Sequence, residues 1–172
     1  ISQSFFLRIT DTGKLGCIID LSQKKLSNTL ALEFSKAIAS PLVANSSKIV
    51  CLNTPPNEKL FSKYSRKNFV SKYNDLDAQG FSDKGIFVFN DEDGLISSGE
   101  MTKIKNKYSD YDKILCALGA EISHLTKFKF IEKCDFYILI GRSFYLDEYT
   151  YKKFSNTVWE KEKKCLGFFL ID

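Results

Sequence analysis

The chain has 172 residues, 44% of them hydrophobic and 27% charged, which is the size and composition of one globular domain with a full core. No apolar run approaches the roughly 20 residues that a membrane-spanning helix needs, so a membrane span within the sequence is excluded. A net charge of +4 is too mild to indicate nucleic acid as a partner, and none is expected. We interpret the lysine clusters at 103–107, 152–153 and 161–164 as solvated helix faces.

The first residues and the cysteines give expectations about the length of the whole protein and its cellular compartment. The chain opens on Ile1, and its first residues lack the basic flank, apolar stretch and cleavage site of a signal peptide. We therefore expect residues 1–172 to be a single domain cut from a longer, membrane-anchored protein. The cysteines stand singly in or at the start of apolar runs, which indicates buried thiols in a reducing compartment. They are Cys17, Cys51, Cys116, Cys134 and Cys165.

Apolar runs of strand length recur along the chain. Residues 4–10 are apolar and end at a turn signal, so they form either an edge strand or a lead-in to the next run. Residues 14–20 hold an apolar core of Leu15, Cys17, Ile18 and Ile19, which predicts a strand buried on both faces, as in a parallel sheet covered by helices. Further strands are expected at 48–52, 85–89, 114–118, 136–140 and 166–171.

Helical periodicity separates these strands. From Ser27 the apolar residues recur every four positions, which predicts an amphipathic helix with Ser27 or Asn28 as its N-cap and Pro41 just beyond its end. Further helices are expected at 96–108, 121–132 and 146–163, and one helix or turn at 58–64 in the polar stretch 57–84. The alternation of strands and helices predicts an α/β fold, a doubly wound and mostly parallel sheet with helices on both faces.

Four stretches carry a resemblance to a known family. They are 27–31 with 37–39, 48–53, 111–117, and 134–140 followed by 166–170. In this order they are similar to the phosphate-loop helix, the two metal-associated strands and the closing strands of the cytoplasmic domain of bacterial tyrosine kinases. Those domains are P-loop ATPases related to MinD and ParA, and they are often fused to polysaccharide chain-length regulators. The resemblance implies a P-loop NTPase-like fold.

The apolar skeleton matches that family, whereas the catalytic residues do not. On this alignment the phosphate-loop lysine falls on Ser27, and no glycine between Gly16 and Gly80 can help backbone N–H groups to close around a phosphate. Asn53 and Ala117 stand where the family has its metal-associated aspartates, so Mg²⁺ would lack both carboxylates. Three losses in one site argue against ATP hydrolysis and phosphoryl transfer.

The residues left in the degenerate phosphate-loop region are Lys24, Lys25, Ser27, Asn28 and Thr29. We expect them to be the remnant of a nucleotide site, with no cofactor bound. ATP and Mg²⁺ would bind only if Lys24 or Lys25 replaced the lost lysine.

No other group of residues predicts catalysis or a metal site. Asp20 lies at the carboxyl end of a strand, where α/β sheets bind ligands. The other acidic candidates are Asp112, Glu121 and Asp135, and none of the four forms a triad or a metal-spaced cluster. The only histidine, His124, lacks a ligand-spaced partner and is interpreted as a surface or locally bonded residue.

The resemblance implies a place at the cytoplasmic face of the bacterial inner membrane, in exopolysaccharide biosynthesis and export. We expect a non-catalytic, pseudokinase-like domain of a chain-length regulator that acts through self-association or a membrane-protein partner. The membrane would be reached through segments outside this fragment. One alternative is a weakly active, ATP-binding protein tyrosine kinase or ATPase with an atypical phosphate loop. Another is a MinD/ParA-like adaptor.

Overall fold

The computed structural model describes residues 3–22, 30–43, 48–54, 85–91, 93–143, 146, 148–160 and 164–171. The elements in chain order are α1 (Gln3–Asp11), β1 (Leu15–Asp20), α2 (Leu30–Val43), β2 (Ile49–Asn53), β3 (Ile86–Asn90), α5 (Leu95–Ser98), α6 (Met101–Lys107), β4 (Lys113–Leu118), α7 (His124–Lys133), β5 (Phe136–Arg142), α8 (Glu148–Glu160) and β6 (Cys165–Ile171). The strands form one six-stranded sheet in the order β3-β2-β4-β1-β5-β6. Every pair of neighbours is parallel, which confirms the predicted sheet.

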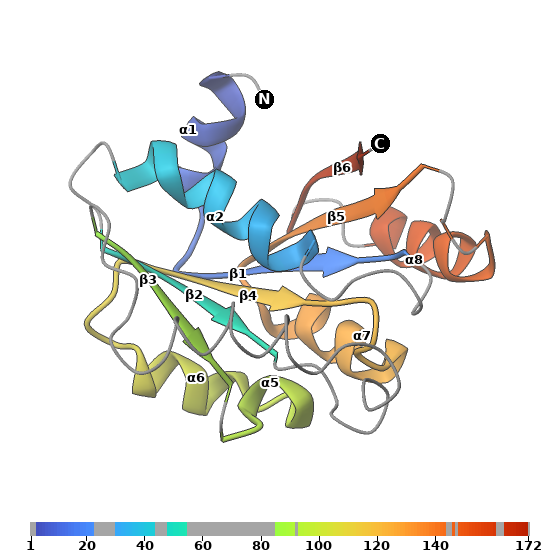
Figure 1. The fold of residues 1–172 in the computed structure, drawn as a ribbon. Coiled ribbons are helices and arrows are strands. Elements are labelled where there is room, and N and C mark those ends of the chain that lie inside the picture. Colours follow the sequence, from blue (N-terminus) through green and yellow to red (C-terminus); the bar gives the residue numbers. More distant parts are fainter. Residues whose placement is uncertain are drawn as a thin grey trace, which may run out of the picture.

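Helices cover both faces of the sheet (Figure 1). On one face, α1 and α2 pack through Phe5, Ile9 and Leu32 against sheet residues that include Ile18 and Ile138. On the other face, α5 to α8 pack against the opposite side chains of the same strands. Because successive residues of a strand point to opposite faces, β1 and β2 must be apolar almost throughout, and every residue of both is buried.

Residues 4–10 belong to helix α1, so the edge-strand interpretation is wrong and the lead-in is a helix. Phe5 and Ile9 are four residues apart, a spacing that places both on one side of a helix, and both are buried against the sheet. The carboxyl end of α1 is held by a lysine from another element. Lys113 at the start of β4 donates from Nζ to the carbonyls of Ile9 at 2.8 Å and Gly13 at 2.9 Å.

Three predicted helix boundaries are wrong, and one expected helix is divided. Pro41 lies inside α2 rather than beyond it, because the helix continues to Val43 and buries Leu42 while Pro41 faces solvent. The expected helix at 96–108 is split at Gly99, whose φ of 72° ends α5 before α6 begins. Helix α7 begins at His124, because Ser123 caps it by accepting the N–H of Thr126. Helix α8 (Glu148–Glu160) does not include Leu146, which pairs with Ser22 in an isolated bridge, and residues 161–163 of the expected helix lie outside the described residues.

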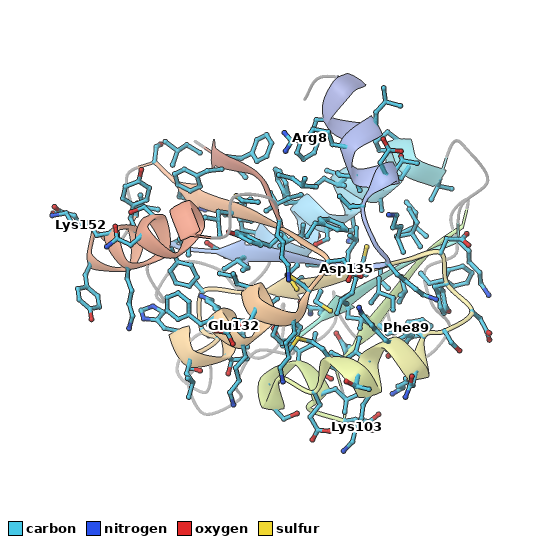
Figure 2. All side chains as sticks on the ribbon, turned by 180° about the vertical axis from the view of Figure 1, so that it is seen from behind. Arg8, Phe89, Lys103, Glu132, Asp135 and Lys152 are labelled. Atoms are coloured by element: carbon cyan, nitrogen blue, oxygen red, sulfur yellow. The ribbon has the colours of Figure 1, made fainter. Side chains whose placement is uncertain are left out.

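The expected N-cap of α2 and the expected helix or turn at 58–64 lie outside the described residues. No helix in the described part of the chain has the length and apolar content needed to cross a membrane. Lys103 and Lys152 lie on the outer sides of α6 and α8 (Figure 2), with side chains 68% and 71% exposed, as expected for solvated helix faces. All five cysteines are free thiols, buried except for the half-buried Cys165.

Candidate functional site

The chain connections reverse direction between β1 and β4, which lie side by side at the centre of the sheet. From β1 the chain passes through α2 to β2, on the far side of β4. From β4 it passes through α7 to β5, on the far side of β1. Open α/β sheets bind their ligands at such a switch point, outside the carboxyl ends of the strands. The candidate ligand site is therefore the carboxyl edge, where β1, β2 and β4 end. It is defined as Asp20, Ser22, Asn53, Thr54 and residues 119–121.

Asp20 is the last residue of β1 and is fully buried. Its Oδ1 accepts the N–H of Ser22 at 2.8 Å, and its Oδ2 has no hydrogen-bond donor among the described residues. Burial raises the pKa of Asp20, an effect that the Ser22 donors and the nearby Lys127 and Arg142 oppose. A carboxyl oxygen left in this state carries a desolvation cost that a bound partner would relieve.

Glu121 brings a second carboxyl group to this edge from the turn after β4. Its Oε1 lies 3.3 Å from the hydroxyl of Thr54, while its Oε2 is buried without a donor in the described part of the chain. A Cβ on Gly119 would lie 2.4 Å from Oε2, so the absence of a side chain there leaves room for the carboxyl group. Burial raises the pKa of Glu121, and the charge of Asp20 adds to that rise.

Lys127 reaches the same edge from the first turns of α7 and is 1% exposed. Its Nζ donates to the backbone carbonyls of Asp20 at 2.8 Å and Ala120 at 3.4 Å, which ties the end of β1 to the turn after β4. Its positive charge lowers the pKa of both carboxyl groups against the effect of burial. The switch point is thus lined by the buried Asp20 carboxyl group, the half-buried Glu121 carboxyl group and the buried Lys127 ammonium group.

The two degenerate family positions lie next to each other in the sheet. Asn53 and Ala117 are register partners on β2 and β4, and both are buried. Asn53 donates from Nδ2 to Oδ1 of Asn90 at 3.3 Å, and Ala117 offers only a methyl group. These two side chains do not fit the Mg²⁺ of Mg-ATP, because neither supplies a carboxylate. The other predicted site residues, Lys24, Lys25, Ser27, Asn28 and Thr29, lie outside the described residues.

The remaining candidates lie away from the carboxyl edge. Asp112 accepts the N–H of Lys48 at 2.6 Å, and Asp135 accepts the N–H of Leu15 at 2.8 Å, both where strands begin. Asp135 is labelled in Figure 2. The ring of His124 packs edge-on against Phe154, with 6.0 Å between ring centroids. Among the described residues, no three His, Cys, Asp or Glu side chains form a group that could hold a metal ion.

Sequence reasoning noted Asp20 and Glu121 singly and missed Lys127. The sequence could have indicated that Lys127 is buried, because Phe130 and Ile131, three and four residues later, lie on the same side of helix α7 and are buried. A lysine within an apolar stripe needs a buried partner for its charge. The link between Asp20 and Glu121 had no local signal, since it arises from the pairing of β1 with β4.

The order of the strands and the placement of the helices can be compared with solved structures. The kinase domain of VpsO aligns with a TM-score of 0.62 and 10% identity, over 97% of this chain and 89% of that one. The chain has the fold of the VpsO kinase domain. The chimerical protein CapA2B2 aligns with a TM-score of 0.61 and 13% identity, over 98% of this chain and 80% of that one.

The likeness to the VpsO kinase domain concerns the fold alone, because the identity is low. It confirms the kinase-like α/β fold that the sequence resemblance implies. No family model matches the chain, and a comparison with curated proteins finds no match either. The function therefore has to be argued from the residues at the switch point.

Proposed function

We propose that this chain is a non-catalytic, kinase-like domain of an exopolysaccharide biosynthesis or export chain-length regulator. It acts through self-association or a membrane-protein partner at the cytoplasmic face of the bacterial inner membrane, without ATP. Its fold, shared with the VpsO kinase domain, supports the kinase-like part of the proposal. The polysaccharide and membrane parts rest on the sequence resemblance.

The observation that carries the non-catalytic part is the pair of side chains at the two positions where the resembled family has metal-associated aspartates. Asn53 and Ala117 are buried register partners on β2 and β4. Asn53 donates its side-chain amide to Asn90, and Ala117 offers only a methyl group. Neither supplies a carboxylate for the Mg²⁺ of Mg-ATP. The sequence also lacks the lysine and the glycines that hold the phosphates in that family.

Titration of the purified domain with Mg-ATP in a calorimeter tests this proposal. We expect no saturable heat at affinities tighter than about 100 μM, which corresponds to roughly 5.5 kcal/mol of binding free energy. Saturable binding below that concentration would favour the alternative of a weakly active ATP-binding kinase with an atypical phosphate loop.

A single substitution sharpens the titration. Ser27→Lys restores the family's lysine, yet it restores neither the glycine cradle nor the carboxylate missing at Ala117. We expect the variant to bind Mg-ATP no better than the wild type. Tight binding by Ser27→Lys would show that the loss of one lysine alone, rather than the missing glycines and carboxylates, keeps ATP out.

Self-association is tested by light scattering coupled to size-exclusion chromatography over a series of protein concentrations. The proposal expects the mass distribution of the domain to be the same with and without Mg-ATP, because assembly no longer depends on nucleotide. A mass that changes on addition of Mg-ATP would contradict it. A nucleotide-independent monomer that binds no membrane-protein partner would favour the adaptor alternative.

A further inference from the structure

The carboxyl edge holds two buried oxygens that the described residues leave without a hydrogen-bond donor, Asp20 Oδ2 and Glu121 Oε2. Asp20 is 0% exposed, so water in bulk does not reach its side chain. A buried carboxyl oxygen without a donor costs free energy, and native proteins rarely tolerate two in one place without a ligand, water or proton to serve them. One oxygen comes from the end of β1 and the other from the turn after β4, at the switch point where this class of sheet binds ligands.

The chemistry of this edge favours a cation. Apart from Lys127 and the Asn53 amide, its polar side chains present oxygen atoms, those of the two carboxyl groups and of the Ser22 and Thr54 hydroxyls. The Thr54 hydroxyl lies 3.3 Å from Glu121 Oε1. Lys127 lowers the pKa of both carboxyl groups, Arg142 also lowers that of Asp20, and the charge of Asp20 raises the pKa of Glu121. The Lys127 ammonium donates to the backbone carbonyls of Asp20 and Ala120. It makes no hydrogen bond to Asp20 Oδ2 or Glu121 Oε2. Hard oxygen ligands of this kind suit Mg²⁺ and Mn²⁺ rather than softer metals.

We propose that Asp20 and Glu121 form a site for a hard divalent metal ion of the Mg²⁺ class, which binds without nucleotide and joins the end of β1 to the turn after β4. Mg²⁺ is commonly held by one or two carboxylates and keeps several water ligands, so two protein oxygens are enough to define such a site. The site differs from the one implied by the family resemblance, because neither Asn53 nor Ala117 takes part. It extends beyond the proposed function, which requires no metal.

Gly119 contributes to the site by leaving space. A Cβ at this position would stand 2.4 Å from Glu121 Oε2 and 2.6 Å from Oε1, so the carboxyl group lies directly over the glycine backbone. Gly119→Ala pushes the carboxyl group away and removes one of the two ligands without changing any charge. This variant tests the position of Glu121 separately from its charge.

The experiment is a titration of the wild-type domain with Mg²⁺ by calorimetry, with Mn²⁺ followed by electron paramagnetic resonance as a second probe, both without nucleotide. We expect saturable binding of one ion per chain. Asp20→Asn and Glu121→Gln should each weaken binding by roughly tenfold or more, and Gly119→Ala should weaken it in the same direction. The matched control is Asp135→Asn at the opposite edge of the sheet, which should leave metal affinity unchanged.

Two results would overturn the proposal. One is the absence of Mg²⁺ and Mn²⁺ binding by the folded wild type, a result that does not depend on any variant. The other is a loss of affinity in Asp135→Asn as large as that in Glu121→Gln, which would mean that the ions bind to surface carboxylates. Because ATP is left out throughout, failure of this inference is distinguishable from failure of the proposed function, which the Mg-ATP titration measures.

Discussion

The two edges of the parallel sheet use the same residue types in opposite ways. Where strands begin, Asp112 and Asp135 are each bound to a backbone N–H, and Asp135 also receives the Lys105 ammonium at 3.0 Å. Where strands end, Asp20 and Glu121 each keep one buried oxygen without a donor in the described part of the chain. The first arrangement stabilises the fold, whereas the second leaves unsatisfied polar groups at the place where ligands bind.

Lysines repeat the same contrast. Lys113 at the start of β4 donates to the carbonyls of Ile9 in α1 and of Gly13 just after it. The carboxylates that raise its pKa, Asp135 and Asp11, are half-buried and exposed. Lys127 also donates to carbonyls, but it is fully buried and its charge acts on Asp20 and Glu121. We infer that Lys113 stabilises the end of α1, whereas Lys127 offsets the negative charges of Asp20 and Glu121.

The largest effect is expected for Lys127→Met. The change keeps an apolar chain of similar length and removes the buried ammonium, a positive charge that acts on both Asp20 and Glu121. Breaking a buried ionic group in this way typically costs about 3–5 kcal/mol of unfolding free energy. Urea unfolding followed by circular dichroism measures it.

The matched control for Lys127→Met is Lys129→Met on the same helix, where the lysine is exposed. We expect a change within about 0.5 kcal/mol for this variant. Equal losses of unfolding free energy in the two variants would show that the effect comes from α7 itself and not from the charges of Asp20 and Glu121.

A smaller effect is expected for Asp135→Asn at the amino edge. Burial would raise the pKa of Asp135, but the Leu15 N–H and the Lys105 ammonium outweigh it and hold the pKa below its ordinary value. The variant loses the charge on which both partners act, at a cost of about 1–2 kcal/mol near neutral pH.

The pH dependence of Asp135→Asn follows from the direction of that shift. Because the folded pKa lies below the unfolded one, the stabilisation by Asp135 is fully present above the unfolded pKa and is lost as the pH falls through the folded pKa. The difference in unfolding free energy between wild type and variant should therefore shrink in acid, as urea titrations at a series of pH values would show. A difference that stays constant down to low pH would contradict a charged Asp135.

The smallest effect on global stability is expected for Lys113→Met. Removing its hydrogen bonds frees the carboxyl end of α1, which also packs through Phe5 and Ile9. We expect a loss of about 1 kcal/mol, confined to α1, so amide hydrogen exchange should accelerate in α1 and stay unchanged in β1. Acceleration throughout the sheet would show that Lys113 supports more than this helix.

The sequence predicted the sheet well because its strands are buried on both faces and are therefore apolar throughout. It failed at α1, because Phe5 and Ile9 have helical spacing within a run too short to show a helical period. It also failed at Gly99, which adopts a left-handed backbone conformation between α5 and α6. The candidate site was the least predictable part. Asp20 and Glu121 are about 100 residues apart, and only the pairing of β1 with β4 brings them to one edge.

The central claim is that the carboxyl edge accepts a metal cation and refuses a nucleotide. A sequential calorimetric titration tests it most directly, with Mg²⁺ added to the wild-type domain until saturation and ATP added afterwards. The account predicts heat of binding from Mg²⁺ and none from ATP up to about 100 μM. Saturable ATP binding to the Mg²⁺-loaded domain below that concentration would contradict it, because the nucleotide would then bind without a phosphate-loop lysine at Ser27 and without carboxylates at Asn53 and Ala117.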